Sequence, residues 1–339
     1  MYSLAVLDDD QDIFVALSRS GQVVLQSSLP AATFSEHFPA LLQEHQVRLK
    51  SSDRLVLLAP QEEGLFRRLW GQRREIRWLE TRGLEFLSLE RMEPGQALAA
   101  RAFQCSGFSQ SAVLCFEKRN QNQERLQLWW ADQSGMRLLW RLNLAPSLAL
   151  FLEQLAHYSG FKGDRSFDHF HDLASYGEPR FVEALLHQAL EWSPQGHLCR
   201  RQIEVEFPRW LGGPARQPEQ PVTAREIDLS ASLEALFKQW AQNIGRELRL
   251  ELKTNNICLT GAPSVAPWLE TYLGQQKSSI NVYTHSGSLK EEMVLGASLW
   301  RPSQTKESLE SSASLGLGAS STSGLDPAAV GRQHLSIDS

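Results

Sequence analysis

The chain has 339 residues, of which 42% are hydrophobic and 22% are charged, and its formal net charge is -5. This length allows two domains or one large two-lobed domain, and the composition is that of an ordinary globular protein. The acidic balance offers no general attraction to nucleic acid or to an anionic membrane, so we expect neither as a partner. The N-terminus lacks a signal-peptide pattern and no apolar run reaches the ~20 residues of a membrane span, so we expect a cytoplasmic protein.

Four cysteines are scattered along the chain without a CxxC pair. Three of them lie in apolar surroundings, which favours reduced core residues over a metal or redox role. They are Cys105, Cys115, Cys199 and Cys258.

Short alternating apolar runs predict that the chain begins as an antiparallel meander of three strands. A strand-helix unit is then added to the meander, which is typical of a mixed sheet. The predicted elements are strands over 3–7, 12–18 and 22–26, a helix over 34–45, a strand over 54–60 and a charged helix over 62–72.

The same kind of pattern recurs in the second part of the chain. Its predicted elements are a helix over 97–103, strands over 111–117, 125–131 and 136–142, and helices over 147–158 and 178–192. Gly160 has the position of a helix C-cap after the first of these two helices. Two copies of strand-strand-strand-helix predict an α/β class protein with a duplicated two-lobed actin-like or sugar-kinase-like (ribonuclease H-like) fold and mixed sheets.

The remaining segments alternate irregular and regular patterns. The Pro- and Gly-rich stretch 194–223 predicts a surface excursion, and apolar spacings of three and four then predict a long amphipathic helix capped by Asp228 or Ser230. The last elements expected are a strand over 256–261, a helix, a strand over 280–285 and a small-residue helix over 293–300. We therefore expect lobe I over 1–94, lobe II over 95–302 and a disordered Ser-rich tail over 303–339.

Several motifs occur in an order that is known from one enzyme family. GFK (160–162) is followed by an acidic stretch, then by LASYGEP (173–179), TGAP (260–263) and GASL (296–299). In this order the sequence resembles the N-terminal, actin-like domain of the O-carbamoyltransferases that act on nodulation factors and antibiotics. The resemblance spans roughly residues 3–300 by order of landmarks. It implies ATP and a divalent metal as cofactors, and a C-terminal domain that makes carbamoyl-adenylate, which we expect this chain to lack.

The metal site that the resemblance implies is degenerate in this sequence. The family's HHxAH motif corresponds to Pro94-Gly95-Gln96-Ala97-Leu98, which contains no histidine. An aspartate after the next strand corresponds to Glu117, and the last ligand falls near Glu292, so these two carboxylates are the remaining, weak metal candidates. Losing two of four ligands should cost much of the metal affinity. We therefore expect no metal and no cofactor.

The implied nucleotide site is weakened in the same way. Gly261 remains from a GG loop that closes on phosphate, but Ala262 and Pro263 follow it, and proline removes a backbone donor. Gly177 remains from the YG turn. Asp8, Asp9 and Asp10 in the first hairpin would repel a bound anion. The two glycines are therefore vestigial nucleotide-binding candidates.

Two residues stay as catalytic candidates. Asp12 corresponds loosely to the acid of the family's first hairpin, and His169 stands where the family has a lysine. His169 and His171, with their neighbouring aspartates, would form a divalent-metal site if they lay on a strand, but a solvated loop is favoured. Arg67-Arg68 and Arg73-Arg74 beside Trp70 are interpreted as a solvated helix face rather than a nucleic-acid site.

Three functional hypotheses follow. The first is a non-catalytic carbamoyltransferase-like protein, a pseudoenzyme that acts as a binding or regulatory partner, for example of a related full-length enzyme. The second is a diverged O-carbamoyltransferase, or an ATP-dependent phosphotransferase, whose site has moved so that Asp12, Glu117 and Glu292 converge near His169. The third is a structural module whose Ser-rich tail is the functional element. The first is preferred.

Overall fold

The computed structural model describes residues 1–9, 11–50, 53–58, 88–120, 123–144, 146–163, 165–201, 206–261, 265–276, 279–285 and 289–300. The chain divides into two compact units, Met1–Arg301 and Pro302–Ser339. The charged helix expected over 62–72, the basic pairs around Trp70 and the Ser-rich tail lie outside the described residues.

The first sheet has five strands in the order β3-β2-β1-β4-β5. They are β1 (Tyr2–Asp9), β2 (Asp12–Arg19), β3 (Gln22–Pro30), β4 (Arg54–Leu58) and β5 (Ser88–Met92), with a 3₁₀ turn (Ala31–Thr33) and helix α1 (Phe34–Glu44) after β3. The first three strands are antiparallel, as predicted, and β4 and β5 are added in parallel, so the sheet is mixed. Strand β5 was not predicted, because its sequence SLERM lacks an alternating apolar pattern.

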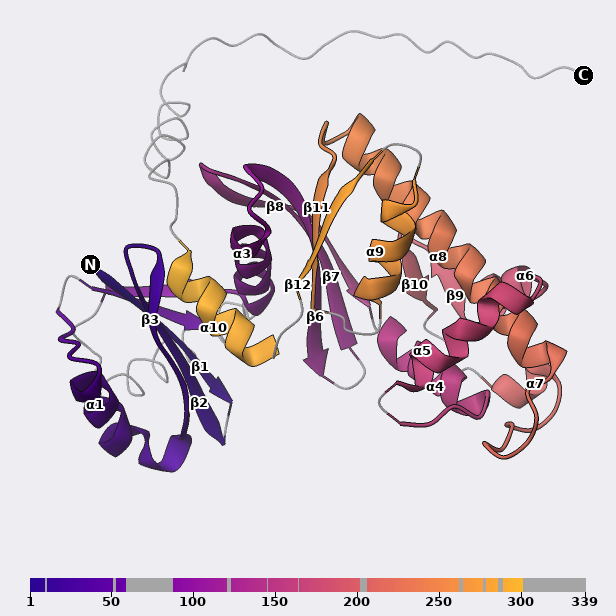
Figure 1. Cartoon of the computed structure of the whole chain (residues 1–339), viewed down its shortest axis with the longest axis horizontal. Helices are drawn as coiled ribbons and strands as arrows, with labels where there is room; N and C mark the ends of the chain where they lie inside the picture. The colour runs from indigo at the N-terminus through magenta and orange to yellow at the C-terminus, as the bar shows by residue number, and fades with distance from the viewer. Residues whose placement is uncertain are drawn as a thin grey trace, which may run out of the picture. The chain divides into compact units, whose positions relative to one another are not determined.

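The second sheet repeats this topology (Figure 1). Its order is β12-β11-β6-β7-β8, built from β6 (Gln110–Asn120), β7 (Gln123–Asp132), β8 (Gly135–Leu144), β11 (Asn256–Thr260) and β12 (Asn281–His285). The meander β6-β7-β8 is antiparallel, whereas β11 and β12 are parallel to β6. Each sheet thus consists of a three-stranded meander whose first strand carries two added parallel strands, which confirms the duplicated actin-like fold.

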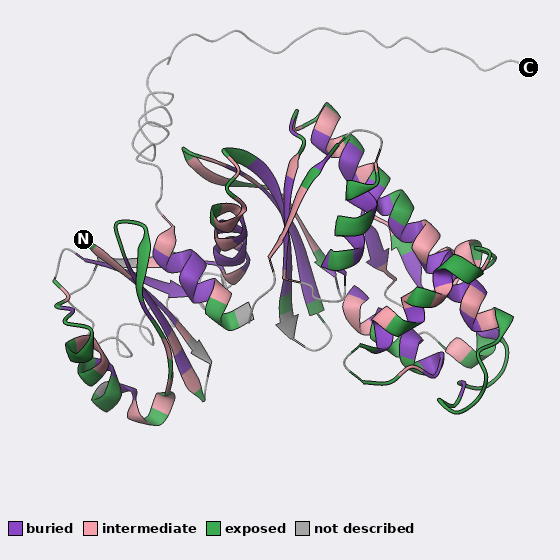
Figure 2. Ribbon diagram, viewed as in Figure 1, coloured by how far each residue is buried: buried purple, intermediate pink, exposed green. Residues whose placement is uncertain are grey.

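Helices of the second lobe cover the sheet around one large core. They are α4 (Leu148–Tyr158), α5 (Ser166–His171), α6 (Val182–Gln188), α7 (Phe207–Leu211), α8 (Ala224–Leu250) and α9 (Ala266–Gly274). Helix α8 has a continuous buried face and an exposed face, as Figure 2 shows, which is the predicted amphipathic pattern. Phe237 and Trp240 on its buried face are fully enclosed with Phe151 of α4 and Phe170 of α5.

Helices α3 (Pro94–Ser106) and α10 (Leu289–Leu299) pack tightly against each other. Helix α10 also packs on β1 and β2, although it follows the second sheet in the chain, and α3 packs on β6 and β11. Gly296 makes this approach possible, since a Cβ atom there would collide with the carbonyl oxygen of Ala97. The predicted close packing of the GASL helix is confirmed.

Three local predictions need correction. The helix expected over 178–192 is only α6, because the chain turns at Ala189 into a two-stranded hairpin of β9 (Leu190–Trp192) and β10 (Leu198–Arg200). The loop expected between 164 and 172 contains helix α5 and continues into a 3₁₀ turn (Asp172–Tyr176). Helix α8 begins earlier than expected, at a capping box in which Thr223 and Glu226 each accept a hydrogen bond from the other's backbone N–H group.

Candidate functional site

Helix α3 begins where the family resemblance places metal-binding histidines. Gly95 in its first turn lies against β6 and β7, and a Cβ atom there would come within 2.9 Å of Glu117 Oε2 and would overlap the side chain of Gln127. A histidine at this position would need both of these buried side chains to move. Gly95 therefore lets the backbone of α3 lie directly against two polar side chains of the sheet.

Glu117, one of the two metal candidates, is engaged by neighbouring side chains. It is 1% exposed and stands directly opposite Arg125 in the antiparallel pair β6-β7. Its Oε2 lies 3.6 Å from Arg125 Nη1 and accepts a hydrogen bond from Gln127 Nε2 at 3.2 Å. A buried carboxylate persists only with such compensation, and here the compensation comes from the protein itself.

The polar network extends along β7 and β8. Gln127 Oε1 accepts a hydrogen bond from Trp129 Nε1 at 3.0 Å, and Arg125 Nε donates to Asn143 Oδ1 at 3.2 Å. Arg125, Gln127 and Trp129 alternate along one strand and therefore share one face of the sheet. This alternation within RLQLWWA was the sequence signal for the network, but sequence alone did not indicate that the face is buried.

Glu292, the second metal candidate, is held in a separate cluster on α10. Its Oε2 accepts a hydrogen bond from Arg101 Nε of α3 at 2.8 Å and lies 2.6 Å from His285 Nε2 of β12. The other ring nitrogen of His285 lies 3.1 Å from the hydroxyl of Tyr283. The side chains of Arg101, Tyr283, His285 and Glu292 thus connect α3, β12 and α10. Burial raises the pKa of the Tyr283 hydroxyl in this cluster.

Neither Arg101 nor His285 is among the candidate residues predicted from the sequence. The sequence nevertheless contains a signal for His285, which is the last residue of the strand predicted over 280–285. In the structure this strand is β12, which runs parallel to β11 and pairs His285 with Thr260. The carboxyl ends of parallel strands are where open α/β sheets place their functional groups.

The two predicted nucleotide-binding glycines serve backbone packing. Gly261 has a φ of 99° and directly follows β11, where it lies against the carbonyl group of Phe116, which a Cβ atom would overlap. At Gly177 a Cβ atom would lie 2.6 Å from the carbonyl oxygen of Ile227 in α8. Both positions therefore require glycine for reasons of space, whether or not a nucleotide binds. Ala262 and Pro263, and the side chains of Asp8, Asp9 and Asp10, lie outside the described residues.

The remaining candidates are not brought together with these groups. Asp12 begins β2 opposite Asp9 and is half-buried. His169 is exposed on α5, which packs against α4 and α8, whereas Glu292 belongs to α10, which packs against α3 and the first sheet. The convergence of Asp12, Glu117 and Glu292 near His169 is therefore not found among the contacts of the described residues.

His169 and His171 lie on a helix, not on a strand or in a loop. Two residues apart on a helix, they point in different directions. His171 packs against Trp268, its Nε2 lies 2.7 Å from the hydroxyl of Tyr272, and burial lowers its pKa. Within the described ranges, no three His, Cys, Asp or Glu side chains gather as a metal site would require. No helix among these residues is long and apolar enough to cross a membrane.

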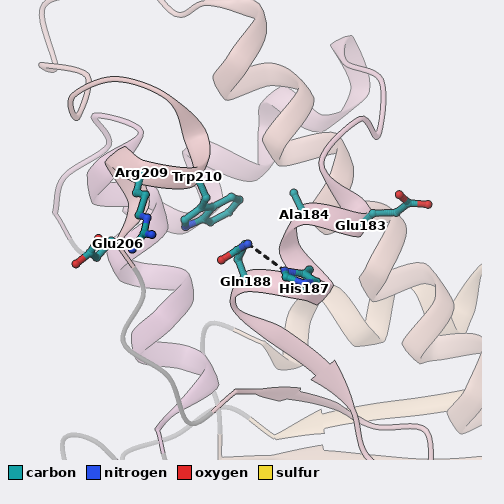
Figure 3. A pocket seen from close by; sticks show the side chains of 7 residues that line it. All are labelled: Glu183, Ala184, His187, Gln188, Glu206, Arg209 and Trp210. Atoms are coloured by element: carbon teal, nitrogen blue, oxygen red, sulfur yellow. Dashed lines mark hydrogen bonds and ion pairs between the residues drawn. The ribbon is translucent and has the colours of Figure 1, made fainter.

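A pocket of about 890 Å³ lies between α6 and α7, and none of the candidate residues predicted from the sequence lines it (Figure 3). Its lining residues are Glu183, Ala184, His187, Gln188, Glu206, Arg209 and Trp210. His187 Nδ1 and Gln188 Nε2 lie 3.0 Å apart on its floor, and the indole of Trp210 faces them. The sequence does not predict this pocket, because one half of it lies in the helix expected over 178–192 and the other half in the irregular excursion expected over 194–223.

The sequence matches no family model. It is 29% identical over 180 residues to the uncharacterized protein sll1178 of Synechocystis sp. (strain ATCC 27184 / PCC 6803 / Kazusa). The aligned region covers 50% of this chain and 29% of that relative, so the chain spans less than a third of the length of the curated protein it matches.

Solved structures with similar architecture include component A of the (R)-2-hydroxyglutaryl-CoA dehydratase of Acidaminococcus fermentans, with 10% identity and a TM-score of 0.42 over 88% of this chain and 96% of that one. The ROK hexokinase of Thermus thermophilus is 15% identical, with a TM-score of 0.41 over 88% of this chain and 98% of that one. YeaZ from Pseudomonas aeruginosa is 21% identical, with a TM-score of 0.31 over 43% of this chain and 68% of that one. At these scores, the fold assignment rests on the strand order of the two sheets.

Proposed function

We propose that this chain is a carbamoyltransferase-like protein that does not catalyse carbamoyl transfer and acts as a binding or regulatory partner of another protein. A related full-length carbamoyltransferase is the partner that the resemblance favours. The proposal rests on the state of Glu117, the carboxylate at the position of a family metal ligand. Its charge is compensated by Arg125 and its oxygen is hydrogen-bonded by Gln127.

A metal ion that binds Glu117 or Glu292 would have to displace the side chains that already hold these carboxylates. Binding through Glu117 would break a buried ion pair and leave the guanidinium of Arg125 without this carboxylate. Removing one partner of a buried pair costs about 3–5 kcal/mol. The second candidate, Glu292, is likewise paired with Arg101 and His285. Metal binding by either carboxylate would therefore break its existing contact with an arginine or histidine side chain.

Calorimetry of the full chain with ATP and either Mg(II) or Fe(II) tests the non-catalytic part of the proposal. We expect no micromolar binding of nucleotide or metal and no ATP turnover. Micromolar binding of both would overturn it. Co-expression with a related full-length carbamoyltransferase from the same genome, followed by size-exclusion chromatography, tests the partner: a stable complex supports the proposal, and separate elution contradicts it.

A second function has one observation in its favour. His285 is held by Glu292 at 2.6 Å and faces the Tyr283 hydroxyl with its other nitrogen, an arrangement that suits a general base. A diverged O-carbamoyltransferase or ATP-dependent phosphotransferase could use this relocated group. It requires ATP turnover that His285→Gln abolishes and that His157→Gln, at an exposed position of α4, leaves unchanged.

A further inference from the structure

A second pocket lies at the edge of the second sheet, beside the hairpin β9-β10. Its volume is about 550 Å³, and its walls come from the end of β8, from the turn after β9 and from β10. The lining residues are Leu142, Asn143, Leu144, Glu191, Trp192, Ser193, Pro194, Cys199, Arg200 and Arg201. Two adjacent arginines and one glutamate give this pocket a positive balance.

Arg200 occupies a strand position where an apolar residue is expected. It pairs with Leu190 across the hairpin and shares a face with Leu198, and both leucines are fully buried in the core of the second lobe. Its guanidinium lies over the ring of Phe151 of α4, with 5.7 Å between Cζ and the ring centroid. A charge on the core-facing side of a strand needs a compensating partner.

Within the described part of the chain, Arg200 has no such partner. Among the described residues, its buried Nε finds no hydrogen-bond acceptor and no carboxylate lies within ion-pair distance of it. Burial accordingly lowers the pKa of Arg200. The next residue, Arg201, behaves differently: its Nε donates to the carbonyl oxygen of Leu190 at 3.2 Å and lies 3.7 Å from Glu191 Oε2.

Arg216 illustrates how this protein otherwise buries a guanidinium. It is 8% exposed, and its Nε donates to the carbonyl oxygen of Ser159 at 2.6 Å. Its Nη1 donates to the carbonyl oxygens of Gln217, Pro218 and Gln220. Arg216 thus fixes a loop, whereas Arg200 makes no hydrogen bond to the described parts of the chain and lies on the wall of a pocket.

We propose that this pocket is a binding site for an anionic small molecule whose phosphate or carboxylate group pairs with Arg200. The planar guanidinium favours two-oxygen groups of this kind because it can donate two parallel hydrogen bonds to them. Trp192 provides an apolar wall, and Asn143 and Ser193 provide uncharged polar groups on the same lining. The role of Arg200 does not rest on the proposed function, although Asn143 also accepts a hydrogen bond from Arg125, the partner of Glu117.

Thermal unfolding of the full chain tests this site with sodium phosphate and sodium citrate as probes, against sodium chloride at equal ionic strength. At roughly tenfold the Kd, the binding anion should raise the Tm of the wild type by about 2–4 °C. The phosphate and citrate arms distinguish a phosphate ligand from a carboxylate ligand. Comparison with chloride and with the variants below separates specific binding from the general stabilisation by anions that are excluded from the protein surface.

Arg200→Met keeps an unbranched stem over Phe151 and removes the charge. We expect it to lose the anion-specific shift, to weaken calorimetric affinity at least tenfold and to unfold no earlier than the wild type without anion. Arg246→Gln, at an exposed position of α8 that lines neither pocket, should keep the full shift. If the Met variant does not fold, Arg200→Lys replaces it, because it keeps the charge but loses the fork and should weaken the shift. A full shift in the Arg200 variant, or no shift beyond chloride in the wild type, would overturn the proposal.

Discussion

Gly296 of α10 lies directly against the main-chain carbonyl group of Ala97 in α3, with no room for a side chain between the two helices. Arg101, one turn further along α3, reaches Glu292 of the same helix pair. This contact connects α3, which packs on the second sheet, to α10, which packs on the first. The close packing of α3 with α10 therefore depends on Gly296, because any side chain at this position would keep the two helices apart.

Replacing Gly296 should destabilise the protein markedly. Gly296→Val forces the helices apart or strains their backbones, and overpacking of this kind costs roughly 1–3 kcal/mol or more. Chemical denaturation measures the loss. Gly274 at the end of α9 is a matched control, because a Cβ atom there meets nothing within 4 Å. Gly274→Ala should leave the free energy of unfolding unchanged or slightly higher, and equal effects of the two changes would contradict the close contact.

The pair Glu117 and Arg125 should behave as a structural unit. Glu117→Gln removes the carboxylate charge that faces a buried guanidinium, and we expect a loss of about 3 kcal/mol in the free energy of unfolding. Adding Arg125→Met should recover most of this loss, which a double-mutant cycle measures. If the single change is neutral for stability, the carboxylate is not engaged as described, and the argument for a non-catalytic site fails.

The stability of the protein should fall between neutral pH and pH 4 because of His197. Trp240 Nε1 donates to its Nδ1 at 3.1 Å, and burial lowers the pKa of His197 to about 4. The unfolded chain, with a histidine pKa near 6.5, binds the proton first, so stability is full above about pH 6.5 and declines as pH falls toward 4. The shift corresponds to at most about 3 kcal/mol.

Glu247 opposes this trend in part. Burial raises its pKa, so the folded state gains a proton there as the pH falls toward the ordinary carboxyl range. Denaturation profiles between pH 7 and 4 should flatten in His197→Gln and keep the wild-type slope in His157→Gln, since His157 is exposed on α4. An unchanged slope in the first variant would contradict a neutral, buried His197.

The capping box of α8 should contribute measurably to stability. Thr223 and Glu226 satisfy each other's backbone N–H groups at the start of a 27-residue helix. Thr223→Ala should cost about 1 kcal/mol in chemical denaturation. Thr271 in α9 provides the comparison, because its exposed hydroxyl only bonds back to the carbonyl oxygen of Pro267. Thr271→Ala should be neutral or slightly stabilising, and a similar loss in both variants would argue against the cap.

The sequence by itself determined the class of fold. Alternating runs gave both meanders, the spacing of Leu233, Phe237 and Trp240 gave the long helix, and the small residues of GASL predicted close packing. These features are local, because residue period and steric preference set them without reference to distant parts of the chain. The domain boundaries, the partner and the loss of catalysis stay predictions.

Only the tertiary structure decided what the candidate residues do. Glu117 and Glu292 are acids in the sequence, but their neighbours Arg125, Arg101 and His285 come from other strands and helices. Arg200 likewise has no hydrogen-bond or carboxylate partner among the described residues only because of the side chains that the fold places around it. Ion pairing and burial depend on distances between side chains that only the folded structure sets. Because the energy of two charges depends on their separation, a shift of a few ångströms decides whether a carboxylate pairs with a neighbouring cation or is free to bind a ligand.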